Sequence, residues 1–145
     1  MTLHLTQSLL ERIAEHARDA YPGECCGLLL GLRRDGQRII HEVINADNVV
    51  GRTHAAQRYE IASRAYLDAD RHARARGWDV LGIYHSHPDA PPIPSRTDLA
   101  EAWPEYVYLI IHVAEGTPGA ARAWTLGDDR FDELPLTVTA GERPS

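Results

Sequence analysis

The sequence predicts a single α/β domain in which helices flank a mixed, mostly antiparallel β-sheet. Its 145 residues match the usual size of one domain. Short apolar runs of strand length alternate with stretches whose apolar residues repeat at helical spacing. An Asp-Gly pair at residues 35–36 separates two of these runs, which is a strong hairpin signal. We expect the folded domain to span residues 1–138 and a flexible C-terminal tail to follow at residues 139–145.

A helix and a hairpin are expected first. Thr6 can cap the N-terminus of a helix that ends near the Pro-Gly pair at residues 22–23. Residues 24–32, ECCGLLLGL, are short and apolar, which indicates a buried strand. After the Asp-Gly turn the chain returns as a second strand over residues 38–45. The first helix is amphipathic because three apolar side chains recur at every fourth position: Leu9, Ile13 and Ala17.

The rest of the chain alternates between strands and helices. Residues 46–57 show no sustained period and are expected to form a loop, followed by a short strand around RYEI, residues 58–61. Residues 63–76 have the pattern of a second helix that stops at Gly77, with arginines in its last turn. The remaining predicted elements are a central strand at 78–87, a short helix at 95–103, a strand at 106–113, and closing strands at 121–126 and 130–138.

Composition argues against several classes of protein. The formal net charge of −6 and the pI near 5.7 disfavour a nucleic-acid binder, which needs a basic face for the phosphates. No apolar run approaches the roughly 18 residues of a membrane-spanning helix, and the N-terminus lacks the pattern of a signal peptide. Cys25 and Cys26 are adjacent, unlike the cysteines of secreted, disulfide-stapled domains. We therefore expect a cytoplasmic protein without nucleic-acid or membrane partners.

One segment, GIYHSHPDAPPIPSRTDL at residues 82–99, concentrates side chains suited to catalysis or metal binding. His85 and His87 lie at the end of the central strand, so both imidazoles face the same way if the strand extends that far. Paired imidazoles suit Zn²⁺, although a His-x-His sequence alone is more often two histidines at a strand end. Four prolines between residues 88 and 94 restrict the turn that follows.

Ser95, Asp98 and Glu24 each admit two interpretations. A serine followed three residues later by an acidic residue resembles a helix capping box. The same aspartate, with His85 and His87, would complete a set of two histidines and one carboxylate that leaves a fourth position open on Zn²⁺. Glu24 enters an apolar strand and is the candidate general base, the alternative being an exposed glutamate at the strand edge. Residue types and spacing leave both interpretations open.

Together these residues resemble the JAMM (MPN+) metalloproteases. The family pattern is an upstream Glu followed by His-x-His-x(10)-Asp with a Ser between, and every position matches without a gap. The segments NADN, residues 45–48, and RYEI also resemble small prokaryotic members, although Tyr59 stands where Phe is commoner. The resemblance extends from about residue 22 to residue 113. The matching positions are Glu24, His85, His87, Ser95 and Asp98.

The resemblance implies both a fold and a reaction. It implies a JAMM/MPN fold, related to that of the cytidine deaminases, with one catalytic Zn²⁺ held by His85, His87 and Asp98. Glu24 would act as general base, and Ser95 would donate a hydrogen bond to the oxyanion. The protein would then be a zinc metallopeptidase or isopeptidase that hydrolyses the bond after the Gly-Gly C-terminus of a ubiquitin-like or sulfur-carrier protein. The carrier, the leaving group and a homodimer stay open.

Other functions have less support. A nucleobase deaminase would need H-x-E followed by P-C-x-x-C, whereas this strand has His-Ser-His. A non-catalytic, zinc-stabilised binding module of the MPN fold is the main alternative, and the retained Glu24 argues against it. A DNA-repair-associated relative has a similar histidine–proline motif, but the acidic charge disfavours that function.

Cysteine catalysis also has little support. Cys25 and Cys26 open an apolar strand, so they are expected to be buried packing residues and not nucleophiles. Outside the motif, His112 is expected to be a satisfied core or sheet-face histidine. Three tryptophans are expected in the core: Trp78, Trp103 and Trp124.

Overall fold

The structure of the chain is a computed structural model that describes residues 2–49 and 59–140. The strands are β1 (Thr2–Thr6), β2 (Cys26–Arg34), β3 (Gln37–Ala46), β4 (Asp79–Pro88), β5 (Val107–Ala114), β6 (Thr117–Leu126), β7 (Phe131–Leu134) and β8 (Leu136–Thr139). The helices are α1 (Gln7–Ala20), α2 (Ser63–Ala75) and α3 (Arg96–Glu101). These elements confirm the two longer helices, the short one and the central strand expected from the sequence.

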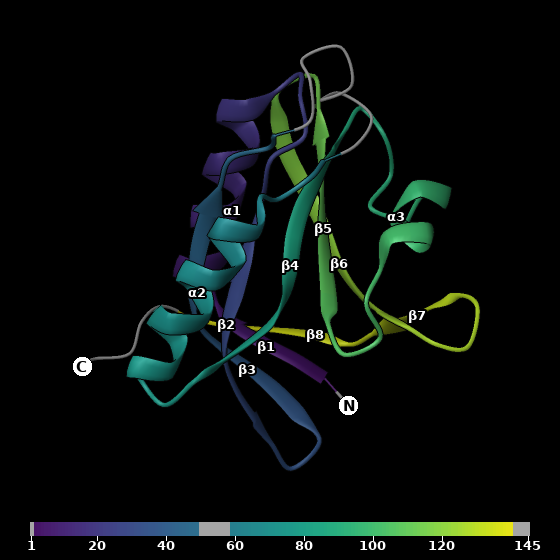
Figure 1. The fold of residues 1–145 in the computed structure, drawn as a ribbon. Coiled ribbons are helices and arrows are strands. Elements are labelled where there is room, and N and C mark those ends of the chain that lie inside the picture. Colours follow the sequence, from purple (N-terminus) through teal and green to yellow (C-terminus); the bar gives the residue numbers. More distant parts are fainter. Residues whose placement is uncertain (1, 50–58, 141–145) are drawn as a thin grey trace.

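Within the described residues the strands form one sheet in the order β7-β6-β5-β4-β2-β3-β1-β8 (Figure 1). Three pairs, β4 with β5, β1 with β3 and β1 with β8, are parallel. The other pairs are antiparallel, including the β2–β3 hairpin predicted from the Asp-Gly turn. The predicted α/β class with a mixed, mostly antiparallel sheet is therefore confirmed.

The two long helices pack on opposite faces of the sheet. The Thr6 side chain caps α1 by accepting a hydrogen bond from the backbone amide of Leu9, 3.2 Å away. In β2, Leu29 belongs to the apolar core beneath α1, whereas Leu28 and Leu30 belong to the core beneath α2. Because both faces of β2 are covered, this strand is apolar at nearly every position and does not alternate.

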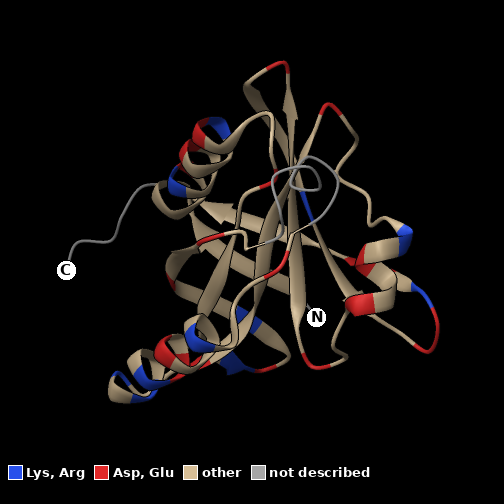
Figure 2. Cartoon of the chain, turned by 45° about the horizontal axis from the view of Figure 1, so that its top comes forward, with Lys and Arg blue, Asp and Glu red and all other residues tan. Residues whose placement is uncertain are grey.

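Residues of both charge signs are distributed along α2 (Figure 2). Arg64 pairs with Asp68 at 3.5 Å and Arg74 with Asp70 at 3.1 Å, each one helical turn apart. Ala73, which interrupts the arginines, is fully buried. The Arg-rich run is therefore a solvated helix end, as its alanine spacing predicts. No helix in the two described ranges is long and apolar enough to cross a membrane.

The structure corrects the expected strands at both ends of the chain. Residues 130–138 form two strands and not one, because Pro135 has no amide hydrogen for the ladder. The Pro135 carbonyl accepts a hydrogen bond from Leu3, and β8 pairs with β1 at the sheet edge opposite β7. The strand β1 itself was not expected.

The segment RYEI contains no strand over residues 59–61, so that prediction is wrong for the described part, while Arg58 lies outside the described residues. Of the expected loop at 46–57, residues 50–57 are likewise outside them. Of the expected tail, Thr139 ends β8 and residues 141–145 lie outside the described part.

The central strand β4 requires a close approach from its neighbour β2. Tyr84 is fully buried, and its hydroxyl lies 2.7 Å from both the Asn45 side-chain oxygen and a ring nitrogen of His16. The tyrosine ring covers Gly27, where an added Cβ would lie 2.2 Å from the ring. Only glycine leaves room for this ring, which fixes β4 against β2 just before the histidine motif.

Candidate metal centre and active site

The histidines of the motif project from the buried end of β4. His85 is 0% exposed and His87 is 6% exposed. Their ring centroids are 5.1 Å apart, so both imidazoles lie on one face of the sheet as expected. His85 pairs in register with Cys26 of β2, and His87 with His112 of β5. Strands on both sides therefore fix the backbone that positions these rings.

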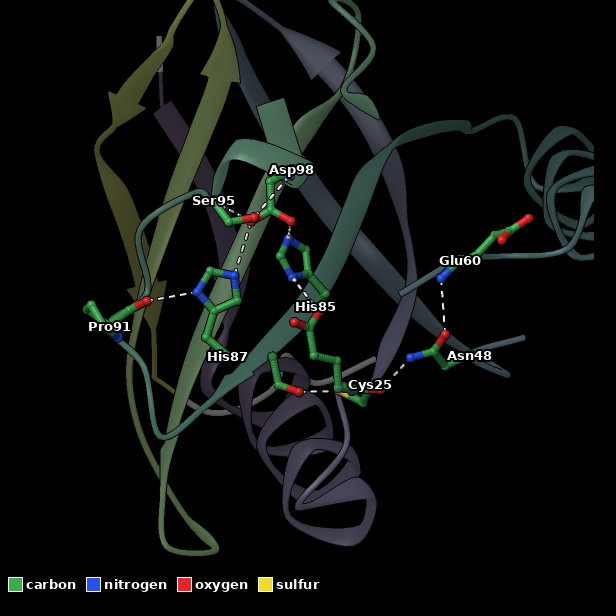
Figure 3. A network of polar contacts seen from close by, with 10 residues as sticks. Cys25, Asn48, Glu60, His85, His87, Pro91, Ser95 and Asp98 are labelled. Atoms are coloured by element: carbon green, nitrogen blue, oxygen red, sulfur yellow. Dashed lines mark hydrogen bonds and ion pairs between the residues drawn. The ribbon is translucent and has the colours of Figure 1, made fainter. Parts of the chain in front are cut away.

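Asp98, from α3, meets the two histidines while it caps its own helix (Figure 3). Its Oδ2 atom accepts a hydrogen bond from the Ser95 amide at 2.8 Å, and the Ser95 hydroxyl accepts one from the Asp98 amide at 3.0 Å. The same Oδ2 lies 3.1 Å from Nε2 of His87. Oδ1 lies 3.8 Å from Nε2 of His85. The capping box and the histidine–carboxylate cluster are thus formed by the same side chain.

This cluster has the donor set of a metal site. One ligand atom from each of His85, His87 and Asp98 lies within 4.8 Å of the other two. Among the described residues, both ring nitrogens of His85 and Oε1 of Glu24 are buried without a hydrogen-bond partner. Buried polar atoms are rarely left unpaired. A cation bound between them would satisfy the His85 nitrogen that faces Asp98, so the residues fit a metal with nitrogen and oxygen ligands.

Hydrogen bonds prepare His87 and Asp98 for such a role. Nδ1 of His87 lies 2.8 Å from the Pro91 carbonyl, which can only accept, so Nδ1 holds the proton and Nε2 faces Asp98. Burial raises the pKa of Asp98, but hydrogen bonding from His87 and the charge of His85 outweigh it and lower the pKa to about 2. Asp98 is therefore an ionised carboxylate at neutral pH.

Glu24 lies immediately before β2 with its carboxylate directed at the cluster. The side chain is 5% exposed, and Oε1 lies 3.6 Å from Nδ1 of His85. Ser86, the residue between the two histidines, accepts a hydrogen bond from the Cys25 amide at 2.9 Å and donates its own amide to the Cys25 carbonyl at 3.2 Å. These bonds hold the chain next to Glu24 against β4, and the edge-glutamate alternative is wrong because Glu24 is buried.

Two residues that were noted only for their family resemblance have clear contacts. Asn48 donates to the Glu24 carbonyl at 3.1 Å and accepts from the Glu60 amide at 3.0 Å (Figure 3). The Tyr59 ring stacks on His85, with centroids 4.4 Å apart and planes at 25°. Asn48 therefore joins the backbone of Glu24 to the segment that covers His85. Ser86 was missed altogether, and no signal in the sequence distinguished it.

A hollow of about 300 Å³ opens beside the cluster. It is lined by Glu24, His87, Pro88, Ala90, Pro91, Ile93 and Ser95. A larger hollow of about 590 Å³ lies around β1, β3 and Trp78 and includes none of the predicted site residues. Of these two, the smaller hollow is the better candidate for substrate, because Glu24, His87 and Ser95 line it.

The cysteines and tryptophans give a mixed outcome. Cys25 and Cys26 are free and buried, as expected, and burial raises their pKa values to about 11 and about 12. Such thiols stay protonated at neutral pH, which argues against a cysteine nucleophile. Trp124 is in the core, but Trp103 is 60% exposed just after α3, so its predicted burial is wrong.

Comparison with known proteins finds one matching family and several similar chains. The model of a family described as prokaryotic homologs of the JAB domain matches residues 6–127. A desampylase from Haloferax volcanii is 34% identical over 94% of this chain and 96% of its own. A CysO-cysteine peptidase from Mycobacterium bovis is 27% identical over 94% and 90%. A solved structure of a Desulfitobacterium hafniense protein superimposes with a TM-score of 0.85, at 31% identity, over 97% and 94% of the two chains.

Proposed function

The chain belongs to the family of prokaryotic JAB-domain homologues, and we propose that it is a zinc-dependent peptidase or isopeptidase. In this proposal it hydrolyses the bond that follows the Gly-Gly C-terminus of a ubiquitin-like or sulfur-carrier protein. The main support is the convergence of His85, His87 and Asp98 with the buried carboxylate of Glu24 beside them. The names of the desampylase and of the CysO-cysteine peptidase support the class of substrate.

Each metal ligand in the proposal comes from an observed contact. His85 and His87 would bind Zn²⁺ through their Nε2 atoms, which face Asp98, and Asp98 would bind through its carboxylate. Zn²⁺ at such a site lowers the pKa of a coordinated water and polarises a carbonyl. The Pro91 carbonyl would keep His87 in the required tautomer by accepting from Nδ1.

Glu24 and Ser95 would perform the proton and charge chemistry. Glu24 would remove a proton from the attacking water and pass it to the leaving amine. This role requires a carboxylate beside the proposed metal ligands, and Oε1 of Glu24 lies next to His85. The Ser95 hydroxyl accepts from the Asp98 amide, so its own hydrogen is available to donate to the oxygen that becomes negative. Both residues line the hollow of about 300 Å³.

Burial of the site restricts the substrate. With His85 at 0% and the His87 and Asp98 side chains at 8% exposure, a scissile carbonyl reaches them only on a slender piece of chain. A Gly-Gly tail has no side chains at the critical positions, so its backbone can approach closely. The proposal includes two kinds of substrate, a lysine-linked conjugate and a carrier with an extended tail. Such carriers would place the activity in the cytoplasm.

The test is intact-mass measurement of candidate carriers after incubation with the protein. Each Gly-Gly carrier is offered in two forms, one extended by cysteine or a short peptide and one linked to a lysine side chain. Parallel samples use chelated protein, Glu24→Gln, and Glu15→Gln as a control on the exposed face of α1. The chain contains no lysine, so the enzyme itself cannot form a side-chain conjugate that confuses the masses.

The expected result is loss of the extension or conjugate with untreated protein and with Glu15→Gln, and no loss with chelated protein or Glu24→Gln. Cleavage that survives chelation would refute zinc dependence. Binding of a carrier without cleavage, unchanged in Glu24→Gln, would favour the alternative of a zinc-stabilised binding module.

A further inference from the structure

The turn between the two halves of the metal centre is held by ring nitrogens from three adjacent strands. We call residues 88–94 the proline turn. Nδ1 of His112, on β5, lies 2.5 Å from the Ala90 carbonyl. Nε1 of Trp124, on β6, donates to the Pro92 carbonyl at 3.1 Å. Between them, Nδ1 of His87 lies 2.8 Å from the Pro91 carbonyl. Three consecutive carbonyls are therefore each met by one ring N–H group.

The composition of the turn explains why donors must come from outside it. Four of its seven residues are prolines, which have no amide hydrogen. Prolines restrict the shape of the turn, but they have no amide hydrogen with which to bond to the neighbouring strands. The carbonyls of the turn can accept hydrogen bonds but cannot donate them. The nitrogens that contact these carbonyls, Nδ1 of His112 and Nε1 of Trp124, therefore each hold a hydrogen. The sheet thus positions the turn through side-chain donors.

The contact from His112 follows from strand register. β4 and β5 are parallel, and His112 is the direct partner of His87. Side chains of paired positions point to the same face, so the two imidazoles reach neighbouring carbonyls of the same turn. Trp124 is 9% exposed and comes from the next strand, β6. The three rings therefore form a row across β4, β5 and β6.

The position of the turn sets the position of Asp98. The first two ligands, His85 and His87, lie on β4 before the turn, whereas Asp98 follows it on α3. The capping box fixes Asp98 relative to Ser95, whereas the contacts of Asp98 with β4 are those with the two imidazoles themselves. A shift of the turn would therefore move the carboxylate away from imidazole nitrogens that now lie 3.1 and 3.8 Å from its oxygens.

We propose that His112 and Trp124 are positioning residues of the metal centre: by holding the Ala90 and Pro92 carbonyls, they place the Asp98 carboxylate at the distance that metal binding requires. They touch neither substrate nor metal. This inference rests on the proposed metal site and names two residues outside its motif on which its affinity depends.

The start of the turn has separate anchors, which allows the two roles to be distinguished. Asp89 donates its amide to the Val113 carbonyl at 2.6 Å, and its carboxylate accepts from the Glu115 amide at 2.7 Å and from the Tyr21 hydroxyl at 2.5 Å. These bonds do not involve His112 or Trp124. Loss of one ring donor should therefore loosen the far part of the turn while the sheet and the start of the turn stay folded.

The experiment measures Zn²⁺ affinity by competition with a chelator, alongside the melting temperature of the metal-free protein. Trp124→Phe removes the N–H group and keeps an aromatic ring in the same buried space. His112→Leu removes the donor, whereas His112→Asn keeps an amide nitrogen near the position of Nδ1. The matched controls are Trp78→Phe and His41→Leu, which alter a stacked pair outside the turn, with ring centroids 5.2 Å apart.

We expect Trp124→Phe and His112→Leu to weaken Zn²⁺ binding by about tenfold or more, the range seen for partners of metal ligands. His112→Asn and both controls should bind Zn²⁺ as the wild type does. The visible spectrum of Co²⁺-loaded protein should change in the two weakened variants alone, because it reports the ligand geometry. If His112→Leu fails to fold, Trp124→Phe decides the question.

Zn²⁺ affinity that is unchanged in Trp124→Phe and His112→Leu, with a melting temperature lowered as in the controls, would overturn the inference and leave the proposed function intact. A wild-type protein that binds no Zn²⁺ would overturn both. A loss of affinity in His112→Asn equal to that in His112→Leu would also overturn it, because the donor would then be irrelevant.

Discussion

Addition of Zn²⁺ to metal-free protein should raise its melting temperature, and the structure indicates by how much. Without a metal, the site packs the Glu24 and Asp98 carboxylates against two buried imidazoles, and three of the polar atoms have no hydrogen-bond partner among the described residues. Those atoms regain water when the chain unfolds, so the metal-free site favours unfolding. A dication bound only to the folded state removes this disadvantage.

The size of the effect follows from mass action. At a free Zn²⁺ concentration about 100 times the dissociation constant, a ligand that binds only the folded state stabilises it by about 2.7 kcal/mol. Each kcal/mol shifts the melting temperature of a chain of this length by about 2–4 °C. The expected increase is therefore about 5–11 °C, well above the error of a thermal melt followed by circular dichroism.

Asp98→Asn separates specific binding from general attraction of the cation. The amide keeps the shape of the side chain but removes its negative charge. In the wild type, the His87 and His85 rings outweigh burial and lower the pKa of the Asp98 carboxyl to about 2, so this charge is present at neutral pH. Because the pKa of Asp98 is lowered overall, its charge also stabilises the metal-free fold, so Asp98→Asn should melt at a lower temperature before any metal is added. The Zn²⁺-induced increase within each variant is therefore the quantity to compare, and in Asp98→Asn the metal loses a proposed ligand. Asp68→Asn removes the same charge from an exposed ion pair on α2. The Zn²⁺-induced increase should vanish in Asp98→Asn and persist in Asp68→Asn. Equal increases in both variants would refute the assigned site.

Further predictions concern the residues around the metal. Ser95→Ala should lower kcat about 10²–10³-fold through loss of the oxyanion donor, and should lower the free energy of unfolding by about 1 kcal/mol through loss of the helix cap. Ser95→Thr should retain most of the activity and most of the stability. A kcat that falls only in proportion to the folded fraction would contradict the catalytic role. Burial raises the pKa values of Cys25 and Cys26 to about 11 and about 12. Iodoacetamide at pH 7.5 should therefore label neither thiol in the native protein and both thiols after unfolding, as measured by mass spectrometry. Rapid labelling of the native protein would contradict this prediction. Gly27→Ala should destabilise the protein by about 1–3 kcal/mol, because its Cβ would lie 2.2 Å from a buried tyrosine ring. In the control Gly119→Ala, the Cβ would meet nothing closer than 3.5 Å, so the free energy of unfolding should change far less. Similar denaturant midpoints for the two variants would refute the packing argument.

The parts of the fold that follow from local pattern were predictable. The central strand and the hairpin that precedes it have apolar runs and a turn pair that do not depend on distant residues. The path of the last residues was not predictable in the same way. The apolar run at residues 130–138 predicts one strand, but Pro135 divides it, and the second piece pairs with β1 at the opposite edge of the sheet. Pairing between distant segments has no local signal.

The same distinction holds within the site. The proposed ligands were predictable because the motif places them at a recognisable spacing, and the capping box is compatible with the proposed ligand role of Asp98. The contacts of the supporting residues were not predictable, because their partners are far away along the chain. Asn48 reaches the carbonyl of a residue 24 positions earlier, and Ser86 accepts from an amide 61 positions earlier. Trp124 reaches a carbonyl 32 positions before it.

The proposed metal centre thus joins two parts that are held in different ways. His85 is paired with β2 and β5, and His87 is paired with β5, so a change that moves either histidine must disturb the sheet as well. Asp98 lies on a six-residue helix whose capping box holds it to Ser95, and in the proposal above the turn sets its distance from the imidazoles. Changes in the proline turn or in its ring donors should therefore alter metal affinity at nearly constant stability. Changes at β4 should alter both together, because there the core and the ligands share the same backbone.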